Sequence, residues 1–231
     1  MIAMGDKLNF VVPTGNFGDI LAGWYAKQMG LPVGKLVCAS NANNVLTDFI
    51  RTGTYDKNRP FHTTASPSMD ILVSSNLERL LYSLSDTEVA GYMQQLREQG
   101  RYTVSDALLA KIRETFAGGF CNDIQTREKI GRAWRDHRYL IDTHTAVAYH
   151  VLDEYRCETG DAAPAVVVST ASPFKFCDQV LRGIGGTADA FGPELIRRLT
   201  CETQIDAPAP LTGLDARPVR FGGCVDRTQM L

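Results

Sequence analysis

Apolar positions near the start of the chain alternate between short runs and helical spacing. The run at 8–12 predicts a strand, because Pro13 after it cannot donate to a sheet ladder. Residues 20–29 carry apolar side chains at a helical period, a second apolar run follows at 35–39, and 44–51 is again helical. Strand, helix and strand at this spacing indicate a right-handed crossover in a parallel sheet.

The pattern changes between about 75 and 138. This segment carries many charges at helical spacing and few strand-like runs, and Ser85 to Glu88 has the sequence of a capping box. We expect helices at about 86–99, 105–116 and 126–137, with breaks at Gly100 and at Gly118-Gly119. The segment is predicted to be a helical insertion on the sheet.

The parallel pattern resumes after 138 and ends in a proline-containing tail. The unbroken apolar run at 165–169 is typical of a strand that is buried on both faces. The other elements expected here are a strand at 139–141 and helices at about 145–157, 174–184 and 193–199. From about 200 to 231 we expect an extended, wrapping tail. The chain, 1–231, is therefore predicted to be an α/β domain with a mostly parallel sheet.

Composition places the chain among ordinary water-soluble globular proteins. Its 231 residues are 44% hydrophobic and carry 24 Lys plus Arg against 26 Asp plus Glu. The net charge of −2 provides no basic field for nucleic acid. The apolar runs are far shorter than the roughly 20 residues of a membrane span, and the first residues lack the pattern of a secretory signal. We therefore expect a cytoplasmic protein with neither a nucleic-acid nor a membrane partner.

Cysteine and histidine spacing argues against a metal site. The 6 cysteines are scattered and form no Cys-x-x-Cys pair, which disfavours both zinc and a disulfide framework. The 4 histidines show no i,i+4 spacing. We expect no metal ligand in the chain.

The segment 12–20 reads Val-Pro-Thr-Gly-Asn-Phe-Gly-Asp-Ile and lies between a predicted strand and a predicted helix. Backbone N–H groups of a first helical turn have no partner within the helix, and the helix dipole favours an anion there. A glycine-rich turn at this place predicts a phosphate site, although the segment matches neither nucleotide-binding glycine motif. A tight turn that needs two glycines for steric reasons explains the pattern equally well.

Five segments along the chain share one family pattern. They are Pro-Thr-Gly-Asn-Phe-Gly-Asp at 13–19, the Asn-rich block at 39–46 with Phe49, Gly53 and Tyr55, the block at 66–71 with Ser75-Asn76, Asp-Thr-His-Thr-Ala-Val at 142–147, and Ser-Thr-Ala-Ser-Pro-Phe-Lys-Phe at 169–176. Together they resemble threonine synthases, which are fold-type II pyridoxal phosphate enzymes. Thr143 stands where the family has proline, and Ser172 where it has histidine. The resemblance implies a three-layer, mostly parallel α/β fold of the tryptophan synthase β-like kind, with pyridoxal 5′-phosphate as cofactor.

The resemblance also implies roles for residues near the cofactor. Since a carboxylate repels a phosphate, we expect Asp19 to cap the following helix with its side chain. Thr170 matches the hydroxyl that faces the pyridine nitrogen, whereas the residues alone indicate a strand-end hydroxyl bonded to nearby backbone. The residues implied to cradle the cofactor phosphate, chiefly through backbone N–H groups, are Gly15, Asn16, Phe17, Gly18 and Asp19.

Four polar residues are assigned to the substrate by their family position, namely Asn41, Asn43, Asn44 and Asp70. The asparagines lie where a strand leads into a helix, the edge at which ligands sit in parallel sheets. Helix capping explains them equally well. His144 either holds a helix start or touches the substrate, and Lys175 is either structural or a charge near the cofactor edge.

Threonine synthases convert O-phospho-L-homoserine and water to L-threonine and phosphate, with a Schiff-base lysine acting as acid and base. The family places that lysine well upstream of the glycine loop, and none of the 7 lysines of this chain has a matching context. We therefore expect no catalytic residue in the chain and no turnover by the chain alone. We interpret it as the carboxyl-terminal part of the enzyme without the amino-terminal domain, and expect an open sheet edge to promote self-association.

Two other interpretations of the resemblance stay open. A related phospholyase of the same fold group would act on another phosphorylated amino compound. A non-catalytic module would bind phosphate or cofactor without the lysine domain. Analysis of the reaction products of a full-length relative separates the phospholyase from a threonine synthase. Titration of the chain with pyridoxal phosphate tests the non-catalytic module.

Overall fold

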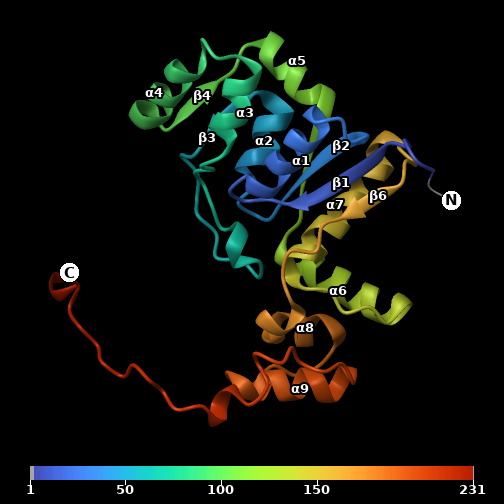
Figure 1. Ribbon diagram of the computed structural model, residues 1–231, viewed down its shortest axis with the longest axis vertical. Coiled ribbons are helices and arrows are strands. Elements are labelled where there is room, and N and C mark those ends of the chain that lie inside the picture. The colour runs from blue at the N-terminus through green and yellow to red at the C-terminus, as the bar shows by residue number, and fades with distance from the viewer. Residues whose placement is uncertain (1–2, 231) are drawn as a thin grey trace.

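The computed structural model describes residues 3–230, and its centre is a parallel sheet (Figure 1). The sheet has the order β5-β2-β1-β6, and each neighbouring pair is parallel. The predicted α/β fold with a mostly parallel sheet is therefore confirmed. Positions 1–2 and 231 of the expected domain lie outside the described residues. The strands are β1 (Leu8–Pro13), β2 (Val33–Ser40), β5 (Phe116–Phe120) and β6 (Ala165–Val167).

Helices cover both faces of this sheet and make three layers. The alternate residues Leu36 and Cys38 of β2 belong to one core, and Val37 and Ala39 belong to the core on the opposite face. Burial on both faces explains why residues 36–39 of this strand are apolar without interruption. The first core is closed by α1 (Gly18–Gln28), α2 (Val45–Thr52) and α5 (Asp106–Thr115), and the second by α7 (Thr143–Thr159).

A second, antiparallel sheet lies beside the first and packs with two helices. Its strands are β3 (Thr54–Asp56) and β4 (Arg101–Thr103), which pair residue by residue from Thr54 with Thr103 to Asp56 with Arg101. The rings of Tyr55 and Tyr102 stack with their centroids 5.4 Å apart. The helices are α3 (Leu77–Leu84) and α4 (Val89–Gln99), which share the first core with these tyrosines.

The expected helical insertion at 75–138 contains a strand of the central sheet, so its all-helical description is wrong. Gly118 and Gly119, expected as a break, lie within β5 and pair with β2. A Cβ on Gly118 would lie 3.1 Å from Thr47 Cα in α2, and a Cβ on Gly119 would lie 2.7 Å from Val151 Cγ1 in α7. Glycine is needed here because the two helices approach β5 closely from its two faces.

Two further expectations near the sheet are corrected by the structure. Residues 139–141 form no strand and instead connect α6 (Asp123–His137) to α7, with Ile141 buried. The run at 165–169 forms only the short β6, and this strand lies at the edge of the sheet. Val166 is 41% exposed, so the strand is not buried on both faces. An apolar run alone does not distinguish these two environments.

Of the last two helices, α8 packs against α6 and α9 packs against α8. A 3-10 turn at Pro173–Lys175 precedes α8 (Cys177–Ile184), so the helix expected at 174–184 is divided at Phe176. After α9 (Pro193–Thr203), residues 212–230 are exposed and run away from the helices, with short 3-10 turns at Leu214–Ala216 and Arg227–Gln229 (Figure 1). The tail is thus extended but does not wrap the domain. Within 3–230, the helices lack the length and apolar character needed to cross a bilayer.

Candidate functional site

A cavity of about 250 Å³ lies at the carboxyl end of β1 and brings the predicted cofactor residues together. The loop from β1 to α1 and the segment after β6 meet there because β1 and β6 are parallel neighbours, and the carboxyl ends of parallel strands share one edge of a sheet. Other walls come from the segment before α3, the start of α7 and the 3-10 turn before α8. The lining residues include Gly15, Asn16, Phe17, Gly18, Asp19, Met69, His144, Thr170 and Lys175.

The loop from β1 to α1 is held in place by one aromatic contact and by hydrogen bonds to Ser75 and Asn76. Phe17 adopts a left-handed backbone conformation, with φ of 64°, and its buried ring packs against Phe116 at 5.5 Å. Asn16 Oδ1 accepts hydrogen bonds from the backbone N–H and the hydroxyl of Ser75, both at 3.0 Å, and Asn76 Nδ2 donates to Asn16 O at 2.8 Å. The aromatic anchor and these polar contacts fix where α1 begins.

The two glycines of the loop meet different surroundings. A Cβ on Gly15 would lie 2.9 Å from the backbone Cα of Met69, so any larger residue would displace the cavity wall. A Cβ on Gly18 would meet only Asn76 Nδ2, at an ordinary 3.6 Å. Neither glycine has a positive φ within the described chain. The steric explanation for a two-glycine turn therefore holds for Gly15 and not for Gly18.

Asp19 does not cap helix α1, and that expectation is wrong. The N-terminal cap position is Phe17, which has no side chain able to accept, and α1 has no side-chain capping hydrogen bond within the described residues. Asp19 instead lies in the first turn of the helix, where the helix dipole favours negative charge without any hydrogen bond. Its carboxylate is exposed and lines the cavity.

Thr170 lies three residues beyond the end of β6 and is exposed toward the cavity. Its hydroxyl has no hydrogen bond to any residue of 3–230, so the alternative of a hydroxyl tied to nearby backbone is not what the structure shows. The neighbouring Ser169 Oγ lies 3.1 Å from Thr145 Oγ1, and this hydrogen bond joins the segment to α7. The assignment of Thr170 to the pyridine nitrogen stays a prediction.

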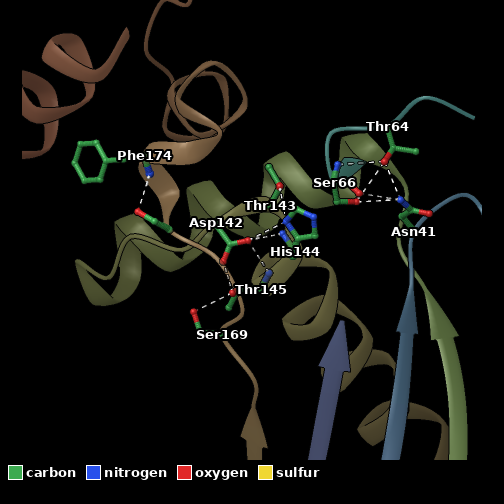
Figure 2. Close-up of polar contacts among 10 residues, drawn as sticks. Asn41, Thr64, Ser66, Asp142, Thr143, His144, Thr145, Ser169 and Phe174 are labelled. Atoms are coloured by element: carbon green, nitrogen blue, oxygen red, sulfur yellow. Dashed lines mark hydrogen bonds and ion pairs between the residues drawn. The ribbon is translucent and has the colours of Figure 1, made fainter. Parts of the chain in front are cut away.

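Asp142 and His144 form a buried pair at the start of α7 (Figure 2). Asp142 is the N-cap: its Oδ1 accepts from the backbone N–H of His144 at 2.8 Å and lies 3.1 Å from His144 Nδ1, and its carboxylate also accepts from Thr145. Burial alone would raise the pKa of the Asp142 carboxyl, but the hydrogen bonds from His144 and Thr145 outweigh burial and hold that pKa below its ordinary value. The His144 ring also packs on Phe176, with centroids 4.8 Å apart.

Three of the four predicted substrate residues form a polar cluster next to this cavity, in which Asn41 and Asn43 are buried and Asp70 is half-buried. Asp70 Oδ1 accepts from Asn41 Nδ2 at 2.8 Å and from Asn43 Nδ2 at 3.0 Å. Thr64, which the sequence does not single out, and Ser66, the first residue of the block at 66–71, join the cluster through Asn41 Nδ2 at 2.8 and 3.1 Å (Figure 2). The cluster adjoins the cavity through Met69, and contact with a substrate stays a prediction.

Asn44 lies outside this cluster, although it occupies the N-cap position of α2. Its side chain makes no capping hydrogen bond, and its Oδ1 accepts from Arg59 Nη1 at 3.0 Å. Capping by the Asn44 side chain is therefore not observed. Within 3–230, no group of three or more His, Cys, Asp or Glu residues has the arrangement of a metal site.

Comparison with known proteins gives these features a family context. A family model described as "Threonine synthase, C-terminal" matches residues 145–225. The threonine synthase of Pseudomonas aeruginosa is 40% identical over 189 residues, which cover 80% of this chain and 40% of that protein. The solved structure of yeast threonine synthase superposes with a TM-score of 0.80 at 32% identity, over 91% of this chain and 43% of that one. The chain resembles the carboxyl-terminal part of threonine synthases.

A second solved threonine synthase, from Brucella melitensis, is described as pyridoxal phosphate bound. It superposes with a TM-score of 0.75 at 40% identity, over 79% of this chain and 39% of that one. The chain spans less than half the length of the curated threonine synthases and threonine synthase-like proteins that it matches. The fold-type II architecture of this group is therefore represented here by its carboxyl-terminal part.

Two positions at which the chain departs from the threonine synthase pattern are accommodated at helix starts. Thr143, in place of proline, is the first residue of α7, a position with no intrahelical N–H partner, and its Oγ1 lies 3.3 Å from His144 Nδ1. Ser172, in place of histidine, caps the 3-10 turn, because its Oγ accepts from the backbone N–H of Phe174 at 3.3 Å. Neither Thr143 nor Ser172 is among the residues that line the cavity.

Proposed function

We propose that the chain forms the carboxyl-terminal part of a threonine synthase and that its cavity holds pyridoxal 5′-phosphate. The observation that carries this proposal is the meeting of the glycine loop and Thr170 in one cavity, at the sheet edge where ligands of parallel folds bind. The intact protein would convert O-phospho-L-homoserine and water to L-threonine and phosphate. The similarity to a pyridoxal phosphate-bound threonine synthase supports the choice of cofactor.

The residues of the cavity fit a phosphorylated aromatic ring. The start of α1 offers backbone N–H groups without intrahelical partners, and Lys175 adds a positive charge to the same wall. Thr170 offers a neutral hydroxyl, which, unlike a carboxylate, does not force a ring nitrogen to carry a proton. When bound, the cofactor supplies an electron sink that stabilises negative charge beside the substrate amine. The chain's own role is to bind and orient that ring.

We further propose that an amino-terminal part of the enzyme supplies the catalytic lysine and that the chain alone does not turn over. Lys175 is the one lysine among the described residues that line the cavity. It follows Pro173 in a 3-10 turn, and its sequence context does not match that of the family's catalytic lysine. The amino-terminal part would pair with β6, whose outer edge has no neighbouring strand within 3–230. Without it, the same edge favours self-association.

A cytoplasmic location is part of this proposal. The cysteines of the described chain are free thiols, and Cys38, Cys121 and Cys177 are buried in the cores. Burial raises the pKa of the Cys38 and Cys121 thiols to about 12, which keeps them protonated and unreactive. Cysteines that form no disulfide within the described chain suit a reducing compartment. Localisation of a tagged copy of the protein in its own cell tests this location.

Calorimetric titration of the purified chain with pyridoxal 5′-phosphate tests the cofactor site. We expect saturable binding, and the absence of binding would overturn the proposal for this cavity. The reaction is tested by adding the amino-terminal half of a threonine synthase as a separate chain. Threonine and phosphate should form from O-phospho-L-homoserine only when both parts are present. Turnover by the chain alone would contradict the inactivity, and turnover of phosphoethanolamine-type substrates instead would identify a different phospholyase.

A further inference from the structure

His144 carries a buried ring nitrogen that no residue of the described chain satisfies. Its Nε2 has no hydrogen-bond partner, although the side chain is only 3% exposed. Buried polar atoms are almost always paired, since leaving one unpaired costs free energy. The residue also lines the cavity at the end of β1. An orphaned nitrogen on a residue of the cavity wall is a candidate to pair with a ligand bound in that cavity.

The orientation of the ring is fixed from its other side. Asp142 lies 3.1 Å from Nδ1 and also holds the backbone N–H of His144, so neither the ring nor its main chain is free to turn (Figure 2). Phe176 covers one side of the ring at a centroid distance of 4.8 Å. A carboxylate next to Nδ1 retains a proton on that nitrogen and leaves Nε2 as the atom available to a ligand. Nε2 is a donor when the ring carries a second proton, a form that anions on both sides of the ring would stabilise.

The surroundings of the cavity indicate what this ligand is. Lys175 contributes a cation, and the first turn of α1 contributes unpaired backbone N–H groups. Asp19 is the carboxylate on the described wall, and it lies on the exposed side of the first turn. We propose that the His144 ring, with a proton on each nitrogen, donates from Nδ1 to Asp142 and from Nε2 to an oxygen of a phosphate monoester bound in this cavity. The proposal rests on the proposed function, because it names a further contact to the phosphate chemistry of the same site.

Nitrogen-15 NMR of the chain labelled at histidine observes this contact directly. Titration with inorganic phosphate should shift the Nε2 resonance of His144 and leave those of His62, His137 and His150 in place, with the assignment made from the H144Q variant. If phosphate binds by calorimetry and the His144 resonance does not move, the contact does not exist. This measurement uses the unmodified protein, so it does not depend on any variant folding.

Binding by variants separates donation from packing. H144M keeps the bulk but loses the donor, and should weaken pyridoxal 5′-phosphate about tenfold or more, the usual effect of losing a hydrogen bond to a charged group. H144Q places an amide N–H near the Nε2 position and should restore most of the affinity. H150Q is the matched control, because His150 is also on α7 but pairs with Glu154 away from the cavity, and it should bind normally. Equal affinity of H144M and the unmodified chain for every phosphate probe would overturn the proposal.

The same variants identify which phosphate group is bound. A loss of affinity for pyridoxal phosphate but not for pyridoxal places His144 on the cofactor phosphate. A loss of affinity only for inorganic phosphate added to the cofactor-loaded chain places it on a second phosphate, as a substrate would carry. If the unmodified chain binds neither pyridoxal phosphate nor inorganic phosphate, the proposed function and this contact both fail. If it binds them and H144M binds as tightly, only the contact with His144 fails.

Discussion

Gly119 lies so close to Val151 that a Cβ at position 119 would be 2.7 Å from Val151 Cγ1. G119A should therefore lower the free energy of unfolding by about 1–3 kcal/mol, the usual cost of overpacking a core. G91A is the matched control: Gly91 lies in helix α4, a Cβ there would meet no atom of the described chain within 4 Å, and alanine should stabilise the helix by up to about 1 kcal/mol. Urea unfolding measures both changes, and equal effects of the two variants would contradict the close contact.

Gly15 and Gly18 should differ in the same way at the cavity. The Cβ of G15A would lie 2.9 Å from the main chain of Met69 and would push the cavity wall outward, so binding of pyridoxal 5′-phosphate should weaken at least tenfold. The Cβ of G18A meets an ordinary contact at 3.6 Å, so cofactor binding should change much less. Calorimetric titration of the two variants checks this order. A stronger effect of G18A would show that the loop is not limited by the Met69 wall.

The hydroxyl of Tyr55 holds the backbone at Leu72 and Ser74 through two hydrogen bonds. It donates to the carbonyl oxygen of Leu72 at 3.0 Å and accepts from the N–H of Ser74 at 2.8 Å. Burial raises the pKa of Tyr55 to about 12, so the donor keeps its proton at neutral pH. Y55F leaves both backbone groups unpaired and should cost about 1–3 kcal/mol of unfolding free energy. Y82F, at an exposed tyrosine, should leave the urea midpoint unchanged.

Asp142 should make the stability of the chain sensitive to acid. Because the pKa of its carboxyl is lower in the folded chain than in the unfolded chain, the unfolded state binds more protons as the pH falls. Its contribution is therefore complete at neutral pH and is lost below about pH 4, near the ordinary aspartate value. D142N should be less stable than the unmodified chain at pH 7, and the difference should shrink as the pH falls toward 3. Urea unfolding between pH 3 and 7 tests this, and a constant difference would contradict it.

The sequence predicts a strand correctly where the strand's own residues show its burial and its end. The strands at 8–12 and 35–39 are recognisable because burial on both faces, or a closing proline, leaves a clear apolar run. β5 escapes sequence-based prediction because its sequence, Phe-Ala-Gly-Gly-Phe, is determined by the helices packed on it, and glycine pairs normally indicate breaks. The exposure of β6 is equally hidden, since it depends on sheet order and not on local composition.

The candidate site can likewise be predicted from the sequence only in part. The meeting of the glycine loop with Thr170 follows from the resemblance and from parallel topology, and the structure brings them to one cavity. The side-chain interactions are less accessible. Asp19 leaves the helix start uncapped because Phe17 occupies the cap position. Asn41 and Asp70 are 29 residues apart in the sequence, so their contact depends on the path of the chain between them. The orphaned Nε2 of His144 is visible only when every neighbour of its ring is known.

The pairing of Val11 with Val167 fixes how β1 and β6 are aligned along the strand direction. The glycine loop follows one of these residues and Thr170 follows the other, so their separation is determined by how the two strands are aligned. A slip of one residue between β1 and β6 would move Thr170 by about 3.3 Å along the strand relative to the loop. The register of β1 and β6 therefore sets the distance between the glycine loop and Thr170. A partner that pairs with the outer edge of β6 would hold this register in place.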